Sequence, residues 1–127
     1  MDLLADTHVF LWWEWRSREL SQTAREAMGD IGNRVFVSVA TVWEISIKRA
    51  SGRLDFDGDT IAACTASGFQ VLPILAEHAE LAGRLPFHHT DPFDRMLVAQ
   101  CMRRGLALIT SDRIMRRYDI PVLPATA

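Results

Sequence analysis

The sequence predicts an α/β fold in which a mostly parallel central sheet of about four to five strands carries helices on both faces. Short apolar segments rich in β-branched residues alternate with helical segments along the whole chain, which is typical of this class. The 127 residues, 49% hydrophobic and 24% charged, suit one ordinary globular domain covering 1–127. No repeat, low-complexity segment or linker interrupts the pattern.

Five apolar segments predict the strands. The first ends directly at Asp6, where a turn begins. The last has prolines near both ends, which is typical of an edge strand. The predicted strands are 3–5, 34–39, 69–74, 106–110 and 120–125.

Helices are predicted between the strands from capping residues and glycines. Thr7 is a possible N-cap of the first helix, and Asp91 followed by proline begins the strongest one, which ends at Gly105. The segment 40–52 has loosely spaced apolar residues, so we expect it to be well buried. The predicted helices are 7–15, 21–30, 40–52, 57–68, 76–85, 91–105 and 112–118.

Charge and cysteine content limit the functional classes. Lys plus Arg total 14 against 16 acids, so nucleic-acid binding would need a local basic patch or a metal. Cys64 and Cys101 lie in apolar helical segments without zinc-ligand spacing, as in a reduced cytoplasmic protein. The start of the chain has no basic region and carries acids within its apolar run. We therefore expect neither a signal peptide nor a membrane span, and a soluble cytoplasmic protein.

Four acids that are far apart in sequence are predicted at one edge of the sheet. Asp6 follows the first strand, and Asp112 follows the strand 106–110 after one spacer. Glu44 lies five residues beyond the second strand, and Asp94 lies in the first turn of the helix 91–105. In parallel α/β folds the functional crevice lies beyond the carboxyl ends of the strands, where the strand order switches.

Each acid also has a purely structural explanation. Asp91 can cap its helix, with Asp94 suiting the helix dipole at the third position, and Asp112 can cap the following segment. Glu44 and Asp6 lie in apolar surroundings and need a partner if buried. A cation shared among the acids would supply one.

An oxygen-only ligand set selects Mg²⁺ or Mn²⁺ rather than zinc, and such a site supports phosphoester hydrolysis. The hypothesis is that metal-activated water attacks a phosphodiester. One alternative is a phosphatase or phosphotransferase of the haloacid-dehalogenase type, although that class has a second Asp where this chain has His8. Another is a non-catalytic binding module whose acids serve only stability.

The chain resembles the PIN-domain ribonucleases, and among them the VapC-type toxins of bacterial toxin–antitoxin pairs. Four segments in the same order carry the resemblance: LLADTHVFLW, SVATVWEISIKRASGRL, HHTDPFDRMLVAQC and LALITSD. The resemblance implies a PIN-like three-layer sandwich. It also implies a Mg²⁺- or Mn²⁺-dependent endoribonuclease that forms a homodimer and binds a small VapB-like antitoxin.

Carried over residue by residue, the family's acidic quartet falls on Asp6, Glu44, Asp94 and Asp112, as catalytic and metal-binding residues. Asp91 and Ser111 are accessory positions of the predicted site. The loop histidines His88 and His89 either contact a ligand or RNA or are solvated. Several cations flank the predicted cleft, where each holds RNA phosphates, pairs with the acids or lies on a solvated helix face. They are Lys48, Arg49, Arg95, Arg113, Arg116 and Arg117.

Overall fold

The computed structural model describes residues 1–127 and contains a five-stranded sheet in which all neighbouring strands are parallel. The strand order is β3-β2-β1-β4-β5. The α/β class, the parallel sheet and the number of strands are therefore confirmed. The strands are β1 Asp2–Ala5, β2 Arg34–Ser38, β3 Gln70–Leu72, β4 Ala107–Thr110 and β5 Val122–Pro124.

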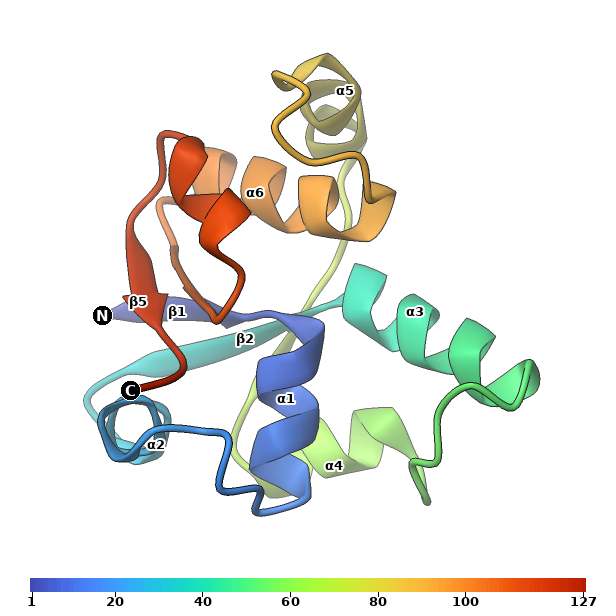
Figure 1. Ribbon diagram of the computed structural model, residues 1–127, viewed down its shortest axis with the longest axis vertical. Helices are drawn as coiled ribbons and strands as arrows, with labels where there is room; N and C mark the ends of the chain where they lie inside the picture. The colour runs from blue at the N-terminus through green and yellow to red at the C-terminus, as the bar shows by residue number, and fades with distance from the viewer.

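Helices cover both faces of the sheet and make three layers (Figure 1). Alternate residues of a strand point to opposite faces, so Leu3 packs with α1, α2 and α4, whereas Leu4 packs with α5 and α6. The helices are α1 Thr7–Glu14, α2 Gln22–Gly29, α3 Val39–Ala50, α4 Thr60–Ala66, α5 Ala76–Arg84, α6 Pro92–Arg104 and the short 3₁₀ helix η1 Arg113–Arg117.

The strand order switches between β1 and β4, at the centre of the sheet. From β1 the chain passes to β2 and β3 on one side, and it later returns to β4 and β5 on the other. The backbone N–H of Asp6 donates to the carbonyl of Ile109 at 3.1 Å. The segments that follow β1 and β4 are therefore adjacent at the carboxyl edge.

The predicted caps of α6 are confirmed, whereas the cap of α1 is not Thr7. The Asp91 side chain caps α6, and Gly105 ends that helix in the left-handed conformation, with φ 64°. Thr7 is instead the first helical residue of α1, because the preceding Asp6 provides the cap. Asp6 has the extended backbone and the short acceptor side chain that an N-cap requires.

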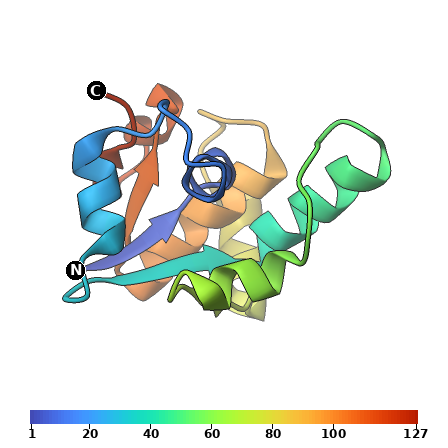
Figure 2. The same cartoon turned by 90° about the horizontal axis from the view of Figure 1, so that it is seen from below.

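The prediction that 40–52 is well buried is wrong. Helix α3 extends outward from the sheet (Figure 2), and only one side of it packs on the protein. Trp43 is 59% exposed, and Val39 and Ile47 are also exposed. Apolar composition alone did not identify the buried side, because apolar residues occupy both sides of this helix.

None of the helices combines the length and the apolar character that a membrane crossing requires. The longest, α6, ends after thirteen residues and carries charged side chains at both ends.

Candidate metal centre

The four predicted acids line one small hollow at the carboxyl edge of the sheet. Asp6 lies between β1 and α1, Glu44 in α3, Asp94 in the first turn of α6, and Asp112 between β4 and η1. The hollow encloses about 140 Å³ and has no hydrophobic side chain in its lining. The lining consists of Asp6, Thr7, His8, Glu44, Lys48, Asp91, Asp94, Ser111 and Asp112.

Asp6 and Asp112 each use one carboxylate oxygen as a helix cap. Oδ1 of Asp6 accepts from the backbone N–H of Val9 at 2.9 Å, and Oδ1 of Asp112 accepts from that of Ile114 at 2.9 Å. These bonds fix both side chains at the edge of the sheet. The second oxygen, Oδ2, is left for other partners, so capping and a role in the site are compatible in the same residue.

Asp91 makes the same kind of cap at the start of α6. Its Oδ1 accepts from the backbone N–H groups of Phe93 at 2.8 Å and Asp94 at 3.3 Å. The structural explanation offered by the sequence is therefore confirmed for Asp91. Its carboxylate also lines the hollow and repels the neighbouring Asp94.

Thr110 at the end of β4 connects two of the acids. Its hydroxyl donates to Oδ2 of the buried Asp6 and accepts from the backbone N–H of Asp112 at 3.0 Å. Burial raises the pKa of Asp6, and the hydrogen bond from Thr110 opposes that rise. Thr110 is thus the side chain that most favours the ionised form of Asp6.

Glu44, which was expected to need a partner if buried, has two within the chain. Its Oε1 accepts from the hydroxyl of Thr7 at 2.6 Å, and its Oε2 pairs with Nζ of Lys48 at 2.7 Å. The side chain is largely enclosed, with Glu44 only 7% exposed. Lys48 is one helical turn further along α3, so this ion pair is local.

Asp94 is a second carboxylate whose surroundings disfavour its charged form. Burial raises the pKa of its carboxyl group to about 7, and repulsion from Asp91, Asp6 and Glu44 adds to the rise. The adjacent His89 opposes it. Burial and the neighbouring acids thus both disfavour the ionised form of this carboxyl group.

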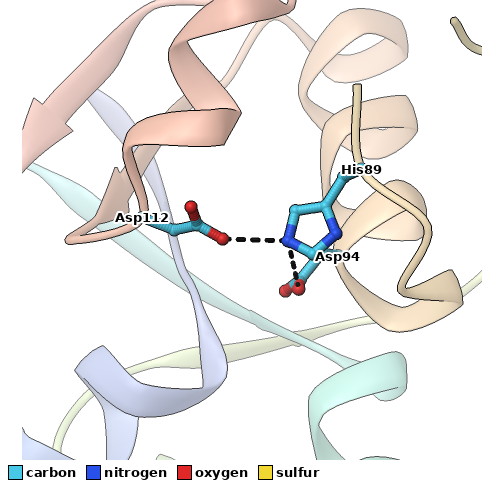
Figure 3. A group of neighbouring side chains, drawn as sticks. All are labelled: His89, Asp94 and Asp112. Carbon is cyan, nitrogen blue, oxygen red and sulfur yellow. Dashed lines mark hydrogen bonds and ion pairs between the residues drawn. The ribbon is translucent and has the colours of Figure 1, made fainter. Parts of the chain in front are cut away.

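His89 lies between two of the acids (Figure 3). Its Nε2 is 2.9 Å from Oδ2 of Asp112 and 3.1 Å from Oδ2 of Asp94. The sequence left open whether this loop histidine contacts the site, and the structure places it there. His88, the other candidate of the loop, is exposed and packs edge-on against the Tyr118 ring, with ring centroids 5.0 Å apart.

Arg95 does not face solvent, so the suggestion that it contacts RNA is wrong. It is 6% exposed, and its guanidinium donates to four backbone carbonyls. These belong to Ala82 and Leu85 at the end of α5 and to Pro86 and His89 in the following loop. Arg95 therefore holds this loop against α6.

Some of these contacts had a signal in the sequence. The spacing of Glu44 and Lys48 is that of a helical ion pair. Thr110 and Asp6, by contrast, are 104 residues apart, and only the pairing of β1 with β4 brings them together. The role of Arg95 had no signal, because an arginine in a first helical turn is ordinarily solvated.

Comparison with known proteins agrees with this architecture. The family model of the PIN domain matches residues 3–121. Ribonuclease VapC22 of Mycobacterium tuberculosis is 26% identical over 130 residues, covering 94% of this chain and 93% of the relative.

Among solved structures, VapBC2 from Rickettsia felis bound to a promoter DNA fragment superposes with a TM-score of 0.71 at 10% identity, over 98% of both chains. A toxin–antitoxin complex from Klebsiella pneumoniae superposes with a TM-score of 0.68 at 19% identity, over 95% of both chains. These structures share the fold of this chain.

An all-parallel sheet of this order, with acids from four elements at its carboxyl edge, defines the PIN class of α/β protein. Because the family model spans nearly the whole chain, the chain belongs to the PIN domain family. The resemblance drawn from its four sequence segments is confirmed.

Proposed function

We propose that this protein is a Mg²⁺- or Mn²⁺-dependent endoribonuclease, the toxin of a toxin–antitoxin pair, with Asp6, Glu44, Asp94 and Asp112 as its site. The observation that carries the proposal is Asp94, a carboxyl group in a hollow that is also lined by four other acids. The similarity to a VapC ribonuclease supports RNA as the substrate.

The residues present fit a hard divalent cation. Acid oxygens dominate the lining, no cysteine is present, and oxygen ligands are those that Mg²⁺ and Mn²⁺ prefer. Asp6 and Asp112 are held by caps that use Oδ1 and not Oδ2. A divalent cation would offset the repulsion that raises the pKa of Asp94. When bound, it would polarise the phosphate and lower the pKa of a water molecule.

The four acids of the proposed site would then have different roles. Asp6 and Asp94 hold the cation from β1 and α6, and Asp112 completes the set from the end of β4. Glu44 already pairs with Lys48, and if Glu44 also joined the ligand set, the ammonium group of Lys48, which lines the same hollow, would lose its partner. A free ammonium beside the hollow would attract a phosphate oxygen.

A second hollow, of about 340 Å³, suits the RNA backbone. Ser111 lines both hollows. The second hollow is also lined by Thr110 and by the exposed side chains of Arg113 and Arg116. Arginine and hydroxyl groups are common phosphate contacts. A strand leaving the acidic hollow past Ser111 would thus meet positive charge, although the chain has a formal net charge of −2.

The partners follow from the relatives. The Klebsiella pneumoniae structure is a toxin–antitoxin complex, and VapBC structures are among the others. We propose that this chain forms a homodimer and binds a small antitoxin in the cytoplasm. Light scattering of the purified chain, alone and co-expressed with the product of a neighbouring small gene, measures both assemblies.

The decisive experiment is cleavage of a mixed RNA pool by the purified protein in Mg²⁺, in EDTA, and by Asp6→Asn in Mg²⁺. We expect cleavage only by the wild type in Mg²⁺. Asp2→Asn is the matched control, because Asp2 lies at the opposite end of the same strand and pairs with Arg34. It should cleave like the wild type.

Two outcomes contradict the proposal. Cleavage that survives EDTA would exclude the cation. Absence of cleavage in all reactions, together with no binding of Mg²⁺ or Mn²⁺, would instead favour a PIN-fold binding module whose acids serve only as caps and ion-pair partners.

A further inference from the structure

His89 makes a contact that the acidic site does not by itself require. Its Nε2 lies within hydrogen-bonding distance of Oδ2 of Asp112 and beside Oδ2 of Asp94 (Figure 3). Ligand atoms of the three residues all lie within 4.8 Å of one another, which is close enough for one cation. Distance alone therefore allows two roles, a metal ligand or a hydrogen-bond donor to the acids.

The hydrogen bond made by the other ring nitrogen, Nδ1, distinguishes these two roles. Nδ1 of His89 accepts a hydrogen bond from the backbone N–H of Asp91 at 3.2 Å. A nitrogen that accepts carries no proton, so the neutral ring has its proton on Nε2. Nε2 therefore donates to Asp112. A histidine that binds a metal through Nε2 instead carries its proton on Nδ1 and donates it to another group. In this protein a proton on Nδ1 would face the N–H of Asp91, which is itself a donor.

The backbone of His89 is held in place on both sides of the residue. The N–H of His89 donates to Oη of Tyr118 at 2.9 Å, and its carbonyl accepts from Nη1 of Arg95 at 3.1 Å. Oη of Tyr118 also donates to the carbonyl of Pro86 at 2.8 Å. Tyr118 follows η1, which begins after Asp112, and Arg95 follows Asp94. The loop is thus tied to both elements that carry the contacted acids.

We propose that His89 is an internal competitor of the metal ion: a neutral Nε2–H donor that occupies the position between Asp94 and Asp112 and leaves it when a divalent cation binds. The inference rests on the proposed function for the identity of the cation. Because the backbone of His89 is held on both sides, its side chain leaves by rotation while the loop stays in place. The metal affinity of the protein is then lower than its acids alone would give.

The first test is calorimetric titration of the full-length protein with Mn²⁺ and with Mg²⁺. His89→Ala removes the competing donor, and we expect it to bind either ion roughly tenfold more tightly than the wild type, the effect of losing one hydrogen bond to a charged group. His88→Ala is the matched control, because His88 packs on Tyr118 and its affinity should equal that of the wild type. Weaker binding by His89→Ala would make His89 a ligand, and unchanged binding would place it outside the site; either result overturns the proposal.

The second test is the ¹⁵N spectrum of the imidazole nitrogens. In EDTA we expect a protonated Nε2 and an unprotonated Nδ1 for His89, and on addition of Mg²⁺ the same tautomer with shifted resonances. A proton that moves to Nδ1 on metal addition would show ligation through Nε2. If neither the wild type nor the variants bound a cation, the proposed function and the competition would both fail. The spectrum in EDTA would still show whether Nε2 of His89 donates a hydrogen bond to Asp112.

Discussion

Thr110 donates its hydroxyl hydrogen bond to the buried carboxylate of Asp6, across the junction of β4 and β1. The same hydroxyl accepts from the backbone N–H of Asp112. One small side chain thus stabilises the ionised form of one acid and fixes the backbone that presents another.

Replacement of Thr110 by Val keeps the shape of the side chain and removes both hydrogen bonds. We expect a loss of about 1–3 kcal/mol in the free energy of unfolding at neutral pH, because a buried carboxylate loses its donor. RNA cleavage should fall at least tenfold, since the pKa of Asp6 rises further. Urea denaturation and cleavage rates measure the two effects. Thr110→Ser retains the hydroxyl and should restore cleavage; equal loss in both variants would contradict this explanation.

Metal affinity should depend on pH through Asp94. Burial and the surrounding acids raise the pKa of Asp94 to about 7, and only the ionised carboxylate binds a cation. Mn²⁺ affinity should therefore be nearly constant above this pKa and fall toward about tenfold per pH unit below it. Titration calorimetry between pH 5.5 and 8.5 measures the profile. An affinity that does not change across this range would exclude Asp94 as the controlling group.

The raised pKa of Asp94 also predicts how Asp94→Asn changes the stability of the protein without metal. The folded protein holds a proton on Asp94 up to a pKa of about 7, whereas the unfolded chain loses it near the ordinary aspartate pKa of 3.8. The contribution of Asp94 to the free energy of unfolding is therefore complete below pH 3.8 and is lost as the pH rises through about 7. In EDTA, Asp94→Asn should therefore gain melting temperature relative to the wild type at pH 8 but much less at pH 5. Asp57→Asn, at an exposed position, is the control.

Arg95 should be important for stability rather than for RNA contact. Arg95→Met removes the donor of four backbone carbonyls, so we expect a loss of about 2–4 kcal/mol in the free energy of unfolding. Arg103→Met, at an exposed position of the same helix, should change it by less than about 0.5 kcal/mol. Equilibrium denaturation compares the two. Equal stability of both variants would show that the carbonyls of the loop find other donors.

Arg113 and Arg116 should affect RNA binding without affecting the metal. In the double variant Arg113→Ala/Arg116→Ala we expect KM for RNA to rise and its salt dependence to weaken, because phosphate contacts are lost. Cation affinity should stay at the wild-type value. Cleavage kinetics at several salt concentrations test this, and an unchanged KM would place the RNA backbone elsewhere.

Local sequence signals predicted much of the molecule. Alternation of apolar strands and helical segments predicted the parallel sheet, and the cap at Asp91 and the glycine at 105 predicted the limits of α6. These features depend on neighbours within a few residues. The position of an acid directly after a strand is also local, so the collection of Asp6 and Asp112 at one edge was predictable once the sheet was parallel.

The failures concern contacts between distant segments. The sequence predicted that Glu44 needs a partner but did not identify Thr7, 37 residues away, which supplies one of its hydrogen bonds. Helix α3 was expected to be buried, although which of its sides packs depends on how it leaves the sheet. Arg95 was taken for a surface cation because its carbonyl acceptors lie in α5 and the loop before α6.

The sequence by itself determined the fold class, the family, and which acids stand at the ends of strands, because these follow from composition, periodicity and order along the chain. Only the tertiary structure decided the distant partners of those acids: Thr110 for Asp6, Thr7 for Glu44, and His89 for Asp112. The physical reason is that the charge state of a buried carboxylate depends on donors and charges within a few ångströms. Only the folded chain brings those groups together.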